Sequence, residues 1–162
     1  MSKSPARSPN PGAARRSAGR LAAVQALYSM EIGDDSVAQA LDHLRERVEG
    51  EPRGGMAQPD LDLATFLITG VAADGADLDR LIGAALTRDW TVDRLEAVLR
   101  AILRAGSLEL KMRPQTPTRV AISEYVDVAH AFYSGPEPGL VNAVLDKVAR
   151  AVRPDEFAKG GA

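Results

Sequence analysis

The sequence predicts an all-α protein, a compact bundle of six or seven helices. Apolar residues recur at spacings of three and four along most of the chain, which places them on one side of an α-helix. No segment alternates apolar and polar residues as a half-buried strand does. Apolar residues make up 45% of the chain and aromatic ones only 4%, so the core must consist of Leu, Val, Ile and Ala. A chain of 162 residues is enough for one such core.

The amino-terminal part of the chain divides into a basic tail and a first helix. Residues 1–12 are mainly Ser, Pro, Gly, Asn and cations, so we expect them to be disordered. A helix is expected from about residue 14 to residue 32, with Arg16 and Arg20 projecting together from its exposed side. Its apolar side is formed by Leu21, Val24, Leu27 and Tyr28. Gly19 weakens this helix by about 1 kcal/mol relative to Ala, so its start is expected to fray without a ligand.

A short helix, a loop and a longer helical stretch are expected between residues 36 and 90. Ser36 is placed to cap the short helix, and residues 50–59 form a loop by composition. Two apolar ladders follow, one after Asp60 and one after Asp77. They consist of Leu63, Phe66, Leu67 and Val71, then Leu78, Leu81, Ile82 and Ala85. Gly70 and Gly75 leave open whether these ladders belong to one bent helix or two.

The stretch from Arg94 to Met112 is expected to be the central helix, capped by Thr91 and stopped by Pro114. Its apolar residues are Leu95, Val98, Leu99, Ile102, Leu103 and Leu110. Ala101, Ala105 and Gly106 add little bulk, so neighbouring helices can approach it from several directions. Glu96, Arg100 and Arg104 share one line at spacing four, a stripe that faces either solvent or a partner protein.

Two further helices complete the predicted domain. Pro117 is well placed to begin the first of them, and residues 134–139 break the chain. A final helix then ends before Pro154. We therefore expect a single helical domain over residues 13–155, with a flexible carboxyl terminus at residues 156–162.

The distribution of charge is uneven along the chain. Residues 1–30 carry five cations and no acid, whereas residues 31–162 carry 15 basic and 22 acidic residues, a net charge of −7. A basic arm on an acidic body is typical of a nucleic-acid contact, but a charged tail that keeps the protein soluble has the same composition. Cysteine is absent, no apolar run approaches the roughly 20 residues of a membrane span, and the amino terminus lacks a hydrophobic signal region. We expect a soluble cytoplasmic protein.

The sequence offers little that resembles a catalytic or metal site. His43 and His130 are the only imidazoles and lie in different predicted helices, where a surface position explains each of them. No phosphate-binding glycine loop and no Gly-x-Ser-x-Gly turn is present. We therefore expect neither an enzyme nor a bound cofactor or metal.

Surfaces are the remaining functional candidates. Arg15, Arg16 and Arg20 are suited to hold successive phosphates and to stack on unpaired bases. Lys147, Arg150 and Arg153 form a basic edge at the end of the last helix, although cations there also complement the helix dipole.

Several segments resemble the NusB family of bacterial transcription antitermination factors, from about Arg15 to Arg153. They are ARRSAGRLAAVQALYS, LITGVAADGADLD, DWTVDRLEAVLRAILRAGSLEL, VAISEYVDVAHAF and LVNAVLDKV. The resemblance implies an all-helical fold without enzymatic activity. It also implies binding of single-stranded boxA RNA in nascent ribosomal RNA transcripts, jointly with the small-subunit ribosomal protein NusE and within an RNA polymerase antitermination complex. A homodimer in isolation is left open.

The resemblance also assigns candidate residues. RNA-binding candidates are Arg15, Arg16, Arg20, Lys147 and Arg150. Partner-binding candidates are Tyr28, Glu96, Arg100, Arg104 and Glu109. The chain departs from the family pattern in the arginine-rich arm, before the Val-Asn motif, on the partner face and in the helix after Pro117. The departures are Ser17, Ala18, Gly139, Leu140, Leu99, Ser123 and His130. Two alternatives stay open: an RNA-binding accessory domain of the kind that precedes a ribosomal RNA methyltransferase, and a protein–protein adaptor without RNA binding.

Overall fold

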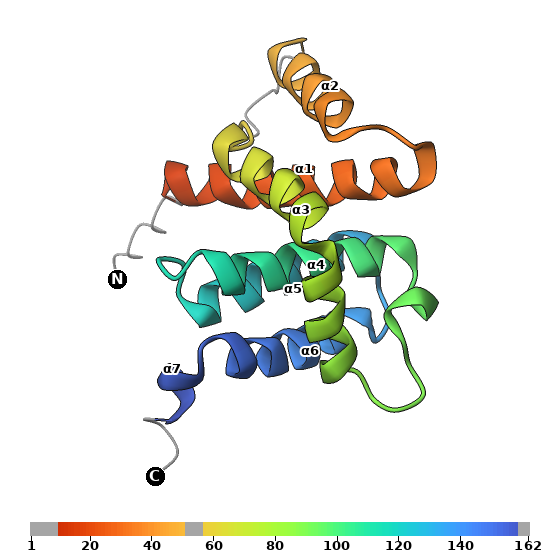
Figure 1. The fold of residues 1–162 in the computed structure, drawn as a ribbon. Coiled ribbons are helices and arrows are strands. Elements are labelled where there is room, and N and C mark those ends of the chain that lie inside the picture. The colour runs from red at the N-terminus through yellow and green to blue at the C-terminus, as the bar shows by residue number, and fades with distance from the viewer. Residues whose placement is uncertain (1–9, 51–56, 159–162) are drawn as a thin grey trace, which may run out of the picture.

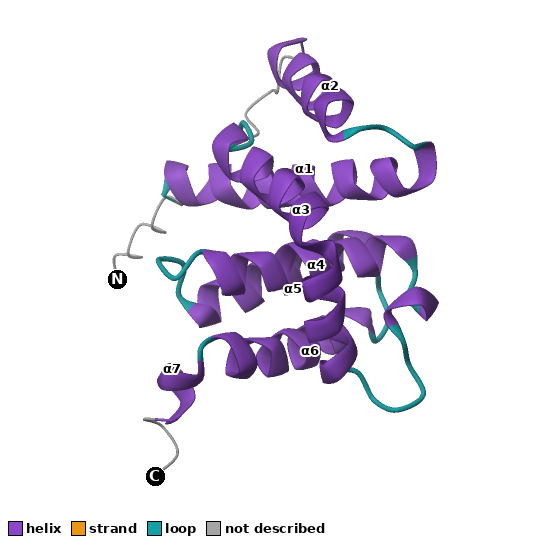
Figure 2. Cartoon of the chain, viewed as in Figure 1, coloured by secondary structure: helices purple, strands orange, loops and turns teal. Residues whose placement is uncertain are grey.

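The computed structural model describes residues 10–50 and 57–158, and within them the chain forms seven α-helices, one 3-10 turn and no strand (Figures 1 and 2). The elements are α1 (Pro11–Gly33), α2 (Val37–Gly50), α3 (Leu61–Ala85), η1 (Val92–Arg94), α4 (Ala97–Met112), α5 (Thr118–Phe132), α6 (Glu137–Val152) and α7 (Pro154–Ala158). The predicted all-α bundle is confirmed. None of the described helices is long and apolar enough to span a membrane.

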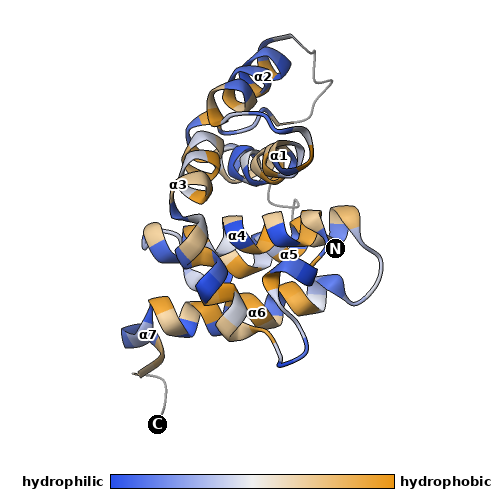
Figure 3. Ribbon diagram, turned by 45° about the vertical axis from the view of Figure 1, so that its right-hand side comes forward, coloured by the Kyte–Doolittle hydropathy of each residue, from blue (hydrophilic) through white to orange (hydrophobic). Residues whose placement is uncertain are grey.

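Helix α4 is the centre of the bundle, as the sequence predicts. It contacts α1, α3, α5 and α6 (Figure 1). Ile102 and Leu103 in the middle of α4 are completely buried. A Cβ atom on Gly106 would lie 2.8 Å from a methyl group of Leu145, so α6 packs closely on α4 at this glycine. In Figure 3, apolar and polar residues alternate along the helices, as expected for helices that bury one side in the core.

Helix α3 consists of two helical segments that meet at a kink, and the two predicted apolar ladders lie on either side of that kink. Asp74 has φ −113° and ψ 16°, outside the helical range, and Gly75 follows it. The bent helix contacts α1 and α2 as well as α4 and α6. Helix α2 packs against α1 and α3 and lies at one edge of the bundle (Figure 1).

Two helix starts are set by local hydrogen bonds. Ser36 caps α2 as predicted: its Oγ accepts from the Gln39 amide at 3.1 Å, and the Gln39 side chain accepts from the Ser36 amide at 2.8 Å. Asn10 caps α1, because its side chain accepts from the Gly12 amide at 2.9 Å. Residues 11 and 12, predicted to be disordered, are therefore the first turn of α1, while residues 1–9 lie outside the described part.

At Gly19, where the sequence predicts fraying, α1 packs closely against the start of α3. A Cβ atom there would lie 2.8 Å from the carbonyl oxygen of Asp60, and the Asp60 amide donates to the carbonyl oxygen of Arg15 at 2.8 Å. Gly19 thus allows the start of α3 to pack directly on α1. The cost in helix propensity is offset by a close helix contact that no other residue permits.

The ends of two other predicted segments also differ from expectation. Thr91 precedes η1 and makes no side-chain cap, so the central helix begins at Ala97 instead of Arg94. Residues 156–158, expected in the flexible carboxyl terminus, are the last residues of α7. Residues 51–56 of the predicted loop and residues 159–162 lie outside the described ranges.

Candidate nucleic-acid and protein interface

The amino-terminal end of α1 carries two cations on its surface. Arg15 is exposed and Arg16 is half-buried, and neither has an ion pair with another described residue. The first turn of α1 contains no acidic residue. Cations near a helix amino terminus gain nothing from the helix dipole, so two unpaired arginines there favour an external anion.

Arg20 is not part of this surface, and the prediction that its side chain is exposed is wrong. Only 2% of Arg20 is accessible. Its Nε and Nη2 donate to the two carboxylate oxygens of Glu109 at 2.8 and 2.7 Å, and its Nη1 lies 3.4 Å from Glu124. The Tyr125 hydroxyl donates to Glu109 at 2.8 Å, and the Ser17 hydroxyl donates to Glu124 at 2.7 Å. The arginine therefore ties α1 to α4 and α5.

Glu109 is completely buried, so its predicted contact with a partner protein is also wrong. Burial alone would raise the pKa of Glu109, but the hydrogen bonds and charge of Arg20 outweigh it and hold the pKa below the ordinary value. Burial and the Glu109 carboxylate raise the pKa of Tyr125. At neutral pH, therefore, Glu109 is a carboxylate, Arg20 is a charged guanidinium and Tyr125 is a neutral phenol.

The predicted partner stripe on α4 is largely occupied within the chain. Arg104 donates from Nε and Nη2 to the two carboxylate oxygens of Asp79 at 2.7 and 2.9 Å. Hydrogen bonding to Asp79 raises the pKa of Arg104 despite partial burial. Arg100 pairs with Glu31 and donates to carbonyl oxygens around η1. These two arginines join α4 to α3, α1 and η1, and only Glu96 of the stripe remains exposed.

The basic edge of α6 is also partly engaged. Arg150 pairs with Asp146 at 3.0 Å and lies over the ring of Phe157, 4.6 Å from its centroid. Arg153 donates to the carbonyl oxygens of Leu110, Arg113 and Thr116 and to the Thr118 hydroxyl. Lys147 is exposed and makes one long contact, 3.4 Å, to a carbonyl oxygen of α3. Lys147 and Arg150 remain accessible, whereas Arg153 holds the ends of α4 and α5 together.

An apolar cleft, missed as a site by the sequence reasoning, lies between α1, α4 and α5. It has a volume of about 350 Å³ and is lined by Val24, Gln25, Tyr28, Ser29, Val98 and Phe132. Tyr28 is 36% exposed and Phe132 40% exposed. Phe132 is the last residue of α5, and this position is the signal that was available, because the chain turns away there.

Comparisons with known proteins were consistent in sequence and in fold. Residues 17–150 match the model of the NusB family. The transcription antitermination protein NusB of Rhodospirillum rubrum is 48% identical, with 90% of this chain and 89% of that protein covered. The NusB protein of Nitrobacter hamburgensis is 49% identical, with 90% and 92% covered.

Solved structures give the same result. NusB of T. maritima superposes with a TM-score of 0.72 at 27% identity, covering 89% of this chain and 96% of that chain. A crystal structure of the antitermination factors NusB and NusE in complex with dsRNA has the same fold, with a TM-score of 0.70, 22% identity and coverage of 85% and 97%. These matches confirm the resemblance seen in the sequence. The chain therefore belongs to the NusB family of transcription antitermination proteins.

Proposed function

We propose that this protein acts in transcription antitermination by binding boxA-type single-stranded RNA of nascent ribosomal RNA transcripts together with NusE. In this role it joins an RNA polymerase antitermination complex. Family membership supports the proposal, and one structural neighbour is a complex of NusB with NusE and dsRNA. The observation that carries it is the pair of arginines at the start of α1, which lack a carboxylate within the described residues and belong to the positively charged segment of an acidic protein.

The RNA surface proposed from this geometry is smaller than the sequence suggested. Arg15 and Arg16 are its centre, because their guanidinium groups are not committed to other described residues. Lys147 and Arg150 are secondary candidates, since Arg150 already has Asp146 and Phe157 as neighbours. Arg20 contributes indirectly by fixing the helix that presents the other two arginines.

Replacing both Arg15 and Arg16 by Ala is expected to weaken RNA binding and to reduce its dependence on salt. The slope of log K against log salt should become shallower by about 0.7 for each phosphate that is no longer bound, the value for single-stranded nucleic acid. The free energy of unfolding should change little, because neither side chain has an ion pair with another residue that the structure describes. A salt titration by gel shift, with boxA-like and scrambled RNA, measures the affinity and the slope.

Arg88→Ala is the matched control for this experiment. Arg88 is exposed in the loop after α3, which lies on the side of the molecule away from the amino terminus in Figure 1. An unchanged salt slope in the double variant would refute the arginine surface. No RNA affinity of the wild type at low salt would instead identify a protein–protein adaptor.

The partner surface proposed here is the apolar cleft between α1, α4 and α5. Tyr28 and Phe132 are large aromatic side chains beside a partly open cavity, and such residues often dominate the energy of protein interfaces. Glu96 is a further candidate for this surface: it is exposed and lies near Tyr133, the residue after Phe132, where burial together with the Glu96 carboxylate raises the pKa of the phenol. Arg100 and Arg104 are structural residues whose replacement would break pairs with Glu31 and Asp79.

Tyr28→Ala is expected to weaken binding of purified NusE by about 2 kcal/mol or more, the range of an aromatic hot spot. RNA binding without NusE should be unaffected, because the cleft does not include Arg15 or Arg16. Calorimetric titration of NusE into the two proteins measures the difference. Ile32→Ala is the control, since Ile32 is 62% exposed on the same helix but outside the cleft. Equal affinities for wild type and Tyr28→Ala would place the partner elsewhere.

A further inference from the structure

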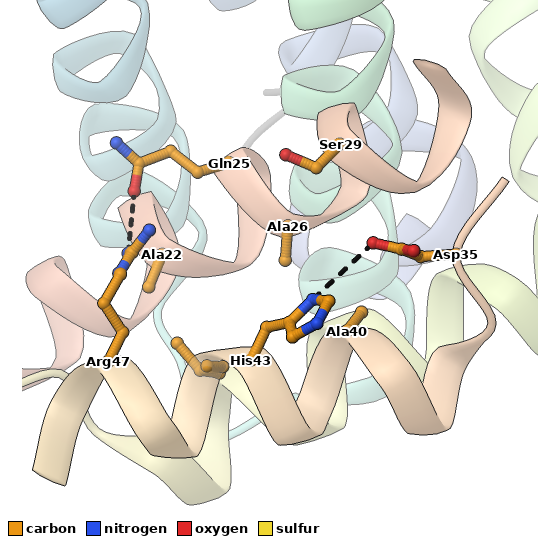
Figure 4. Close-up of a pocket in the computed structure, with 9 residues that line it drawn as sticks. Ala22, Gln25, Ala26, Ser29, Asp35, Ala40, His43 and Arg47 are labelled. Atoms are coloured by element: carbon orange, nitrogen blue, oxygen red, sulfur yellow. Dashed lines mark hydrogen bonds and ion pairs between the residues drawn. The ribbon is translucent and has the colours of Figure 1, made fainter. Parts of the chain in front are cut away.

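A second cleft lies on α1, between that helix and α2 (Figure 4). Its volume is about 120 Å³, far above the roughly 10–15 Å³ that admits one water molecule. Small side chains leave the space open, and polar groups stand around it. The lining residues are Ala22, Gln25, Ala26, Ser29, Asp35, Ala40, His43, Leu44 and Arg47. In Figure 4, Arg47 points toward Gln25 at one end, and His43 points toward Asp35 at the other.

This cleft adjoins the proposed partner surface. Gln25 and Ser29, one helical turn apart, line both the cleft against α2 and the apolar cleft that contains Tyr28. The two clefts therefore lie on either side of one ridge of α1. A protein that covers Tyr28 and extends past this ridge meets α2.

Arg47 is the charged group best placed to contact such a protein. Its Nη2 donates to the neutral side chain of Gln25 at 3.2 Å, and no carboxylate of the described residues lies within salt-bridge distance of it. By contrast, Arg45 on the same helix pairs with Asp42 at 3.5 Å. A guanidinium has five N–H donors in a planar fork, so Arg47 retains donors for an acceptor that enters the cleft. A carboxylate is the acceptor that this fork matches best.

The surroundings of Arg47 favour a single carboxylate over the phosphates of RNA. Asp35 stands in the cleft beside His43, at 3.6 Å, and α2 also carries Asp42, Glu46 and Glu49. These acids repel a polyanion that follows the helix. One acidic side chain that reaches directly to Arg47 avoids most of that repulsion.

We propose that the partner surface extends across α1 onto α2, where Arg47 receives an Asp or Glu side chain of the same ribosomal protein that occupies the apolar cleft. The inference rests on the proposed binding of NusE. The contact of Arg47 with a carboxylate would add a polar interaction to the apolar one at Tyr28. The ridge formed by Gln25 and Ser29 separates the two. Such a contact fixes the angle at which the partner sits and contributes to its rate of association.

The test is a calorimetric titration of purified NusE into the full-length protein and into Arg47→Ala, Arg47→Glu and Arg45→Glu. We expect affinity to fall about 5-fold for Arg47→Ala and at least about 10-fold for Arg47→Glu, with the gap narrowing as salt is raised. Arg45→Glu is matched in residue type, helix and charge change, and it should bind NusE within about 2-fold of the wild type. Thermal unfolding should be alike for all four, because both arginines are exposed.

The outcomes separate the inference from the proposed function. Failure of the wild type to bind NusE would overturn the proposed function itself. Binding by the wild type, loss with Tyr28→Ala and no loss with either Arg47 variant would overturn only the extended surface. Equal losses in the Arg45 and Arg47 variants would show general charge attraction and overturn it too. A loss of RNA affinity in Arg47→Ala without NusE would overturn it in favour of a phosphate contact.

Discussion

Glu109→Ala is expected to lower the free energy of unfolding by about 3–5 kcal/mol, because it leaves a buried guanidinium without its carboxylate. Arg20 is 2% exposed and Glu109 is inaccessible, so water cannot replace the missing oxygens without opening the core. Tyr125 loses the acceptor of its hydroxyl in the same variant. Urea unfolding followed by circular dichroism measures the change. A loss below about 1 kcal/mol would mean that Glu124 compensates for the missing charge.

The dependence of stability on pH provides an internal check of this pair. The pKa of Glu109 in the folded protein lies below its ordinary value of 4.5, so its ionisation stabilises the fold above that value. This contribution is lost as the pH falls through the folded pKa. Glu109→Gln should therefore be less stable than the wild type at neutral pH and lose less stability on acidification. Glu46→Gln, which removes an exposed carboxylate of α2, should leave the curve unchanged.

Leu103→Ala is expected to cost about 2–5 kcal/mol, through reduced burial and the cavity that remains. Leu103 has no exposed surface and lies in the middle of α4, where four other helices meet. Met112→Ala, at the exposed end of the same helix, should cost less than about 0.5 kcal/mol and controls for helix propensity. Denaturant unfolding of both variants decides the point. A cost below about 1 kcal/mol for Leu103→Ala would contradict the orientation of α4.

The helices and their inner sides could be predicted from the sequence because both depend on neighbouring residues. Leu103 and Ile102 follow the spacing of three and four, and Ser36 begins a capping box that spans only four residues. The bend in α3 was narrowed to two alternatives by Gly70 and Gly75. The structure places the kink at Asp74, directly before Gly75.

The candidate site was harder to predict, because the fate of a charged side chain depends on residues far along the chain. Spacing put Arg16 and Arg20 on one side of α1, but it could not show that Glu109 covers the second of them. The same holds for Arg104, which forms an ion pair with Asp79 on α3. The sequence alone does not distinguish an arginine that pairs with a buried acid from one that binds a phosphate.

The ion pair between Arg20 and Glu109 also limits when α1 can take up its final contacts during synthesis on the ribosome. Its two residues are separated by 89 positions, and Ser17 and Glu124 by 107. At about 5–20 residues per second, the ribosome needs roughly 5–20 s to bridge these separations. During that time Arg20 lacks its carboxylate partner, and α1 can pack only against α2 and α3. The segment that carries the proposed RNA contact is thus translated first, and its link to α4 and α5 through Arg20 forms only after those helices exist.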